Sequence, residues 1–204
     1  MLNGIDISKH NKNMKNVADL NKLDFVIMKA SEGATYRDAS LSYYMLHLEP
    51  EMLKGFYHFA RPENGNSAKS EASNFLSSCL KYIDGRSILA LDVEAAALTY
   101  TNLDKWVLEW CEYVYNATGI KPMIYCSVSE CHRFKKAAKF SCGLWVAKWS
   151  LIKPSKTRLK PWDFFAIWQD SNKYYFSGVR CDHDKFNGTK DQYLKYCKDG
   201  RNNG

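Results

Sequence analysis

The sequence predicts an α/β fold in which eight short strands close into an irregular barrel. Apolar segments of strand length recur along the 204 residues, and the earlier ones are separated by segments with the periodicity of amphipathic helices. The later ones lie too close together for such helices. Strands that alternate with helices pair in parallel, and eight of them can close into a barrel.

Eight segments have the composition of strands, with apolar and β-branched residues between turn residues. The segment at 88–94 is apolar almost to its end, as expected of a strand that is covered on both faces of a parallel sheet. The predicted strands cover residues 2–7, 25–30, 54–60, 88–94, 122–126, 144–149, 164–169 and 178–182.

Helices are predicted between the earlier strands, where apolar residues recur at intervals of three and four. Residues 67–83 carry such a stripe and are followed by Gly85, a residue typical of the position after a helix. Residues 101–118 carry another stripe, which opens with Thr101 and Asp104 in a capping-box-like arrangement. Shorter helices are predicted around residues 17–23 and 41–48.

The last three predicted strands leave little room for packed helices. A parallel crossover needs about a dozen residues or more. The segments that follow residues 149 and 169 and lead to the next predicted strands are short. We therefore expect loops or hairpins there, and a flattened barrel. The barrel is expected to span residues 1–188, and the polar residues 189–204 are expected to form a tail or the stub of a linker.

Composition excludes several classes of protein. The apolar fraction of 46% suffices for a full core, and no apolar run approaches the roughly 18 residues that span a membrane. The seven cysteines lack both disulfide-scaffold and zinc spacing, so we expect mostly buried free thiols in a reducing compartment. Residues 1–15 contain charges and no apolar core of signal-peptide length, so we expect synthesis in the cytoplasm without a signal peptide.

The candidate site begins with two carboxylates at the end of the strand predicted at 88–94. Asp92 and Glu94 are two residues apart, so in a strand both side chains project to the same side. Two like charges side by side gain nothing for packing. They do keep one carboxyl group protonated near neutral pH, as a general acid requires. The pair therefore predicts a hydrolase that works with paired carboxylates.

Two further carboxylates are expected at the same end of the barrel. Asp6 lies near the end of the first predicted strand and Asp182 at the end of the eighth. In βα barrels the active site lies at the C-terminal ends of the strands. The first and eighth strands are neighbours in a closed barrel, so Asp6 and Asp182 should lie together, across the mouth from Asp92 and Glu94. A single such Asp is commonly a helix cap, but four at equivalent positions indicate a site.

Eight short blocks occur in order along the chain, and together they resemble glycoside hydrolase family 25, the N-acetylmuramidases that include many phage endolysins. The resemblance covers roughly residues 2–188. The blocks read GIDIS at 4–8, FVIMKASEG at 25–33, GFYHFARP at 55–62, LDVE at 91–94, IYC at 124–126, LWVAKW at 144–149, IWQ at 167–169 and DHD at 182–184.

The resemblance implies a flattened, irregular TIM-like (β/α)5(β)3 barrel, in which five βα units precede three strands with few or no helices. It also implies a lysozyme that cleaves the β-1,4 bond between N-acetylmuramic acid and N-acetylglucosamine in peptidoglycan. Glu94 would be the general acid/base, and Asp6, Asp92 and Asp182 the supporting carboxylates. Relatives often hold Asn at positions such as Asp184, which is therefore left out of the catalytic set. We expect the charge of Asp92 and of neighbouring acids, with partial desolvation, to raise the pKa of Glu94.

Substrate contacts are expected near the strand ends, where aromatic faces can stack on sugars and polar groups can hold hydroxyls. The predicted substrate-binding residues are Tyr57, Tyr125, Glu32, Trp149 and Gln169. His58 is expected to be buried and hydrogen-bonded. No histidine shows the spacing of a metal ligand, so we expect neither a metal nor another cofactor.

The expected partner is the glycan strand of bacterial peptidoglycan, which the enzyme would reach at the cell wall after phage lysis or non-standard export. No membrane insertion and no obligate protein partner are expected. Two alternatives stay open: a noncatalytic wall-binding module and a glycosidase of chitin-type glycans. The net charge of +7 also suits nucleic acid. An acidic mouth repels phosphate, however, so we expect no nucleic-acid partner.

Overall fold

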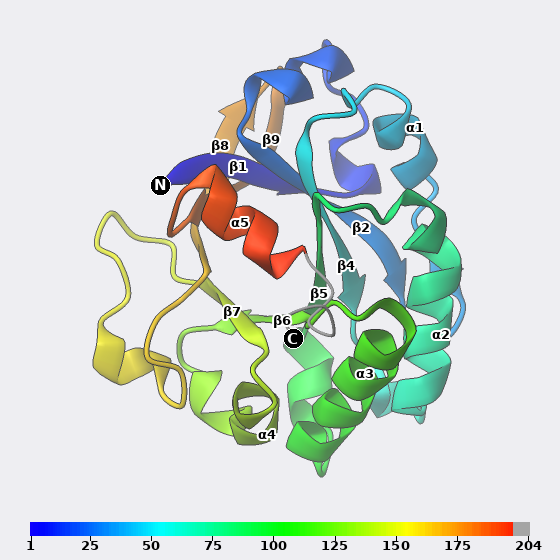
Figure 1. Cartoon of the computed structure of the whole chain (residues 1–204), viewed down its shortest axis with the longest axis vertical. Helices are drawn as coiled ribbons and strands as arrows, with labels where there is room; N and C mark the ends of the chain where they lie inside the picture. Colours follow the sequence, from blue (N-terminus) through cyan, green and yellow to red (C-terminus); the bar gives the residue numbers. More distant parts are fainter. Residues whose placement is uncertain (198–204) are drawn as a thin grey trace.

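The computed structural model describes residues 1–197, and within them eight strands form a closed barrel. The strands follow the order β1-β9-β8-β7-β6-β5-β4-β2, and the pairing of β1 with β2 closes the ring (Figure 1). A two-residue strand, β3 (Tyr36–Arg37), pairs with the end of β2. The barrel strands are β1 (Leu2–Ile7), β2 (Phe25–Glu32), β4 (Leu53–Phe59), β5 (Ser87–Asp92), β6 (Met123–Ser127), β7 (Gly143–Ala147), β8 (Ile167–Phe176) and β9 (Val179–Phe186).

Helices follow the first five barrel strands, which confirms the predicted α/β barrel of five βα units followed by three strands. Between β7 and β8 the described chain forms only a short 3-10 helix, η7 (Lys156–Leu159). The connecting helices are η2 (Val17–Lys22), α1 (Leu41–Met45), α2 (Ala68–Cys79), α3 (Leu103–Thr118) and α4 (Lys135–Lys139). The other 3-10 helices are η1 (Lys9–Asn11), η3 (Pro62–Asn64), η4 (Leu80–Tyr82), η5 (Ala95–Thr99) and η6 (Cys131–Arg133).

The last strand runs antiparallel to its neighbours, in agreement with the loops or hairpins expected between the last strands. β9 pairs antiparallel with both β8 and β1, and β8 and β9 form a hairpin. The expectation that Asp182 lies at the end of its strand is therefore wrong, because β9 continues to Phe186. Asp182 still reaches the predicted end of the barrel, because β9 enters from that end and its register places Asp182 opposite Asp6.

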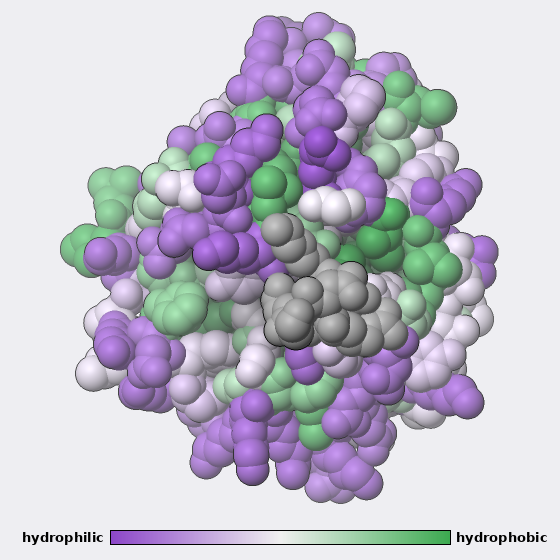
Figure 2. Space-filling model, viewed as in Figure 1, coloured by the Kyte–Doolittle hydropathy of each residue, from purple (hydrophilic) through white to green (hydrophobic). Residues whose placement is uncertain are grey.

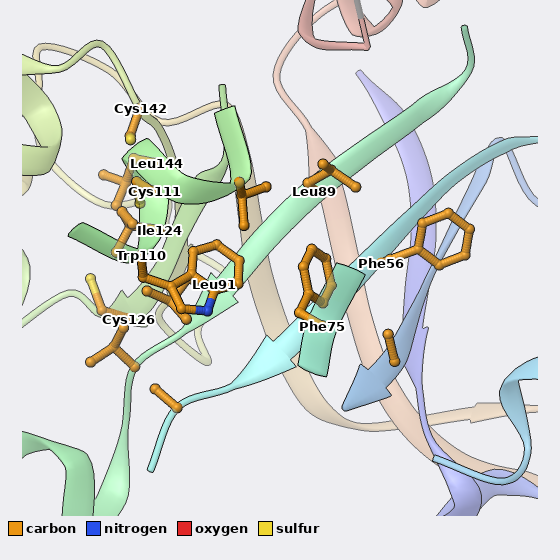
Figure 3. Close-up of a cluster of buried hydrophobic side chains, with 14 of the residues drawn as sticks. Phe56, Phe75, Leu89, Leu91, Trp110, Cys111, Ile124, Cys126, Cys142 and Leu144 are labelled. Atoms are coloured by element: carbon orange, nitrogen blue, oxygen red, sulfur yellow. The ribbon is translucent and has the colours of Figure 1, made fainter. Parts of the chain in front are cut away.

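Two apolar layers stabilise the barrel. The outer layer lies between strands and helices, where Phe75 and Trp110 meet strand residues such as Leu91 (Figure 3). The inner layer fills the barrel, and Phe25 is one of its buried members. A Cβ on Gly4 would approach the Phe25 carbonyl oxygen to 2.5 Å, so only glycine fits beside that ring. Because side chains alternate between two apolar layers, the strands read as continuous apolar runs.

A short helix, α5 (Lys190–Tyr196), closes the barrel at the N-terminal ends of the parallel strands (Figure 1). Its Tyr193 is fully buried, with ring centroids 5.5 Å from Phe25 and 5.1 Å from Phe186. The Tyr193 hydroxyl donates to the carbonyl of Lys54 at 3.0 Å. The stretch expected to be a polar tail is thus, as far as residue 197, a helix that packs on the barrel. Residues 198–204 lie outside the described residues.

The capping box predicted at the start of α3 is wrong. The residue before the helix is Asn102, which has a φ of 63° and makes no side-chain cap hydrogen bond. Asp104 instead accepts a hydrogen bond from the backbone N–H of Lys136 at 3.0 Å, which ties α3 to α4. A tertiary contact therefore uses the side chain that local pattern assigned to a cap.

The surface around α5 is mainly polar, with apolar side chains in separate patches (Figure 2). Within residues 1–197 no helix combines the length and the hydropathy needed to cross a bilayer. The predicted site carboxylates lie at the end of the barrel opposite α5. Asp6 and Asp92 are the last residues of β1 and β5 whose side chains face the interior of the barrel.

Candidate active site

Asp92 and Glu94 project to the same side of the chain, as their spacing predicts. β5 ends at Asp92, but the backbone stays extended through Glu94, with φ −146° and ψ −174°. Between them, the Val93 N–H donates to the carbonyl of Tyr125 at 3.0 Å, and the Val93 side chain packs in the outer layer. Ala95 then adopts a φ of 50° and turns the chain into η5. Both carboxylates therefore face the mouth of the barrel.

Asp6 and Asp182 complete the cluster from the other side of the mouth. They are register partners on the antiparallel strands β1 and β9. The charge of Asp182 raises the pKa of both Asp6 and Glu94, and the charges of Glu94 and Asp6 raise the pKa of Asp92. The structure thus brings the four predicted carboxylates into one electrostatic cluster.

The pKa of Glu94 is raised by burial and by a neighbouring acid, as the sequence suggested. Burial contributes most and the charge of Asp182 comes next, while Lys29 and Arg61 act in the opposite direction. Burial also raises the pKa of Asp92 well above its usual range, which favours its neutral form. The charge that contributes most is that of Asp182, and not that of the adjacent Asp92 as expected.

The two remaining carboxylates also bind protons more tightly than usual. Burial, followed by the charge of Asp182, raises the pKa of Asp6 to about 7, although hydrogen bonds with Gln169 and Asp184 lower it. Burial raises the pKa of Asp182, and Arg180 acts against that rise. Near neutral pH the cluster therefore shares protons instead of carrying four full charges, and it can both deliver a proton and present negative charge.

Gln169 connects three of the predicted site residues from beneath the mouth. Its Nε2 donates to Asp6 Oδ2 at 2.8 Å. Its Oε1 accepts from the Tyr125 hydroxyl and from Trp149 Nε1, each at 2.9 Å. Since Gln169 is only 2% exposed, it positions the side chains above it, and the predicted direct contact between Gln169 and the substrate does not fit this burial.

Hollows open on both sides of the carboxylates. One of about 290 Å³ lies beside β1 and β9, and one of about 200 Å³ lies beside the ends of β5 and β6. Predicted site residues line both: Asp6, Asp182 and Tyr57 the first, and Glu94, Tyr125 and Trp149 the second. A wider groove of about 700 Å³ continues past Trp149 to the β8–β9 hairpin. Together these spaces give the mouth the form of an elongated cleft.

Glu32 does not stand free at the mouth. Its carboxylate pairs with Lys29 Nζ at 2.6 Å and with Arg61 Nε at 2.7 Å. Burial would raise its pKa, but the hydrogen bonds from Lys29 and Arg61 outweigh burial and lower it. Glu32 therefore holds the two cations that lower the pKa of Glu94, and a direct contact with substrate stays a prediction.

The comparison with known protein families identifies the family of the chain. A family model described as "Glycosyl hydrolases family 25" matches residues 5–179. The chain belongs to glycosyl hydrolase family 25.

Solved and curated relatives of this family 25 enzyme are similar over almost its whole length. A family GH25 lysozyme from Aspergillus fumigatus is 30% identical, with a TM-score of 0.79 over 97% of this chain and 99% of the other. A bacterial lysozyme from Streptomyces coelicolor is 26% identical, with a TM-score of 0.81 and 96% of each chain covered. The N,O-diacetylmuramidase of Arthroderma benhamiae is 28% identical over 97% of this chain and 87% of its own length. The enzyme is thus a glycoside hydrolase of the lysozyme type.

Sequence reasoning left Asp184 out of the site of this family 25 enzyme and missed Arg180. Asp184 is completely buried, and a hydrogen bond links it to Asp6. Arg180 lines the hollow beside Asp182 and lowers its pKa. The signal for Asp184 was present, because it follows Asp182 by two residues, as Glu94 follows Asp92. Nothing in the local sequence distinguishes Arg180 from the other basic residues.

The structure confirms that His58 is buried and hydrogen-bonded and that the cysteines are buried free thiols. The His58 ring is fully buried among the helices and hydrogen-bonds Ser31 Oγ and Glu71 Oε2, each at 2.8 Å. All seven cysteines lie in the described part of the enzyme as buried free thiols. Over residues 1–197 no three His, Cys, Asp or Glu side chains gather in a way that could hold a metal ion.

Proposed function

We propose that this enzyme is a muramidase that cleaves the β-1,4 bond between N-acetylmuramic acid and N-acetylglucosamine in peptidoglycan. The observation that carries the proposal is the cluster of four carboxylates in an elongated cleft, with a raised pKa at half-buried Glu94. The muramidase and lysozyme names of the relatives support the same substrate. The bacterial cell wall is then the place of action.

In this proposal Glu94 donates the proton to the leaving oxygen. A general acid must be protonated near the working pH and must reach the scissile bond. Burial and the charge of Asp182 keep the proton on Glu94, and the side chain lines the hollow beside β5 and β6. Asp6 and Asp92 are more deeply buried and are less able to reach a bound glycan.

The positive charge that develops on the sugar requires a negative group opposite Glu94. Asp182 suits this role, because it is half-buried and Arg180 favours its ionised form. Asp92, whose burial raises its pKa and favours the protonated form, suits hydrogen-bond donation to the substrate's 2-acetamido group. Two routes then compete: direct attack by Asp182, or attack by the acetamido oxygen. A covalent adduct on Asp182 with a 2-fluoro sugar would identify the first, and strong inhibition by a thiazoline analogue the second.

Aromatic side chains along the cleft are proposed to bind the glycan. Trp149 is 60% exposed, and its indole is oriented by the hydrogen bond to Gln169, so its ring can stack on a sugar. Tyr125 and Tyr57 are buried, and only a small part of each side chain is exposed to the cleft. These two are better suited to oriented polar contacts than to stacking.

Digestion of purified peptidoglycan tests the proposed bond. The products are reduced with borohydride, and the new ends are identified by mass spectrometry. Muramitol ends are expected. Glucosaminitol ends would place the cut at the other glycosidic bond. Equal turnover on chitin oligomers would favour a chitin-type glycosidase, and no new ends from several wall types would indicate a noncatalytic module.

Replacement of Glu94 by Gln tests the proposed acid. The Glu94→Gln variant keeps the shape of the side chain but cannot donate the proton, so turnover should fall by about 10²- to 10⁴-fold. Sedimentation with insoluble peptidoglycan should show unchanged binding. Glu109→Gln, on the exposed face of α3, is the matched control. Wild-type turnover of Glu94→Gln would remove Glu94 from the mechanism.

A further inference from the structure

Asp184 lies one step below the mouth, on the face of β9 that also carries Asp182. The register of β1 and β9 places it opposite Gly4, directly beneath the pair of Asp6 and Asp182. Its side chain is completely buried. Oδ1 accepts a hydrogen bond from Trp145 Nε1 at 2.8 Å, whereas Oδ2 is buried and meets no donor among the described residues.

A buried carboxylate oxygen without a donor carries a large desolvation penalty. Asp184 nevertheless shares a side-chain hydrogen bond with Asp6. Two carboxyl groups can share such a bond only when one of them holds a proton. Asp6 accepts from Gln169 Nε2 at 2.8 Å and keeps 9% exposure, whereas Asp184 is completely buried. A charge costs more in the completely buried position, so Asp184 is the group that holds the proton and Asp6 is the acceptor.

We propose that Asp184 is a positioning residue that works as a neutral carboxylic acid, with its hydroxyl donating to Asp6 and its carbonyl oxygen accepting from the Trp145 indole. Together with Gln169 it holds the Asp6 carboxylate from two directions and favours its ionised form. The positioning role rests on the proposed function, because it takes Asp6 to act at the reaction centre. The protonation state of Asp184 does not depend on it.

The surroundings of Asp184 favour the neutral form. Burial is the main cause of the raised pKa of Asp184, the charges of Asp6 and Asp182 add to it, and the Trp145 hydrogen bond acts against it. From below, α5 contributes Tyr193, whose own pKa is well above its usual value. Cys181, the preceding residue on β9, is also held neutral, because burial raises its pKa to about 12. The proton therefore stays on Asp184 while Asp6 titrates near pH 7.

Two substitutions separate this proposal from a purely structural role. Asp184→Asn keeps both hydrogen bonds, because the amide N–H can donate to Asp6 and the amide oxygen can accept from Trp145. Asp184→Ala removes both. We expect Asp184→Ala to lower turnover by about 10- to 100-fold and to move the ionisation of Asp6 in the pH–rate profile to higher pH. Asp184→Asn should restore turnover to within about threefold of wild type and leave that ionisation close to its wild-type position.

If Asp184 were instead ionised, Asp184→Asn would remove a charge beside Asp6 and move the same ionisation to lower pH. That shift, or a loss of turnover equal to that of Asp184→Ala, would overturn the proposal. Infrared spectroscopy of the protein without substrate detects the protonated carboxyl group directly. The carbonyl band of a protonated carboxylic acid should persist at pH 8 in the wild type and lose intensity in Asp184→Asn. Equal band intensity in the wild type and in Asp184→Asn at pH 8 would also overturn the proposal. This result would not depend on which bond the enzyme cleaves.

Discussion

Replacement of Asp6 by Asn should make the protein more stable at neutral pH while it abolishes turnover. In the folded protein the pKa of Asp6 is raised from 3.8 to about 7, mainly by burial and by the charge of Asp182. A carboxyl group with a raised pKa stabilises the folded state fully below pH 4. That contribution is lost as the pH rises through about 7, because the buried group must then ionise. A rise of this size corresponds to about 4 kcal/mol at about 1.4 kcal/mol per pH unit.

The assay is urea denaturation of the wild type and of Asp6→Asn at pH 4 and at pH 8. At pH 4 both side chains are neutral, so the two proteins should have similar free energies of unfolding. At pH 8 Asp6→Asn should be more stable by about 4 kcal/mol. This is a large part of the 5–15 kcal/mol that is typical of a folded domain. Turnover should be lost, because the amide cannot carry the charge of Asp6.

Asp84→Asn is the control with the opposite sign. Burial would raise the pKa of Asp84, but the hydrogen bond and charge of Lys54, whose Nζ lies 2.7 Å away, together with hydrogen bonds from the Arg86 backbone and Ser87, outweigh burial and lower it. Asp84 therefore stabilises the fold above its unfolded pKa, and its replacement should lower stability at pH 8. Equal stability of Asp6→Asn and the wild type at pH 8 would refute the assignment of a high pKa to Asp6.

Two further predictions concern the base of the barrel and the charge at its mouth. Tyr193→Ala should lower the free energy of unfolding by about 3–5 kcal/mol, whereas Tyr175→Ala, at a side chain that is 74% exposed, should change it by less than about 0.5 kcal/mol. Equal effects in denaturation would mean that α5 does not contribute to the barrel. Lys29→Met should move the alkaline limb of the pH–rate profile to higher pH, since Lys29 lowers the pKa of Glu94. Lys22→Met removes a similar but exposed ion pair and should leave the limb in place, and a shift in both variants would contradict the reasoning.

Periodicity identified the barrel because its strands lie between two apolar layers. All eight barrel strands overlap the predicted segments. The strand boundaries were less predictable, as in β8, which extends to Phe176 beyond the predicted end at 169. Its outer part forms the hairpin with β9, and hairpin residues that face solvent have no apolar run to mark them.

The four carboxylates of the candidate site could be predicted from the sequence, since their predicted positions at strand ends and the two-residue spacing of one pair place them together at the mouth of the barrel. Burial and neighbouring acids were expected to raise the pKa of Glu94, but their relative weights were not predictable. The largest charge effect comes from Asp182 on a distant strand, and not from Asp92, which is adjacent in sequence. Gln169 was assigned to the substrate, because only the fold reveals that it lies beneath Asp6 and Tyr125.

The sequence by itself determined the class of fold, the four carboxylates and the family, because these depend on residue type and on local spacing. The tertiary structure decided the direction of β9, the packing of α5 and the state of each proton in the mouth. Those properties depend on which groups lie together and on how far water is excluded from them. Asp184 illustrates the difference: the sequence places it two residues after Asp182, and only its complete burial beside Asp6 turns a carboxylate into a hydrogen-bond donor.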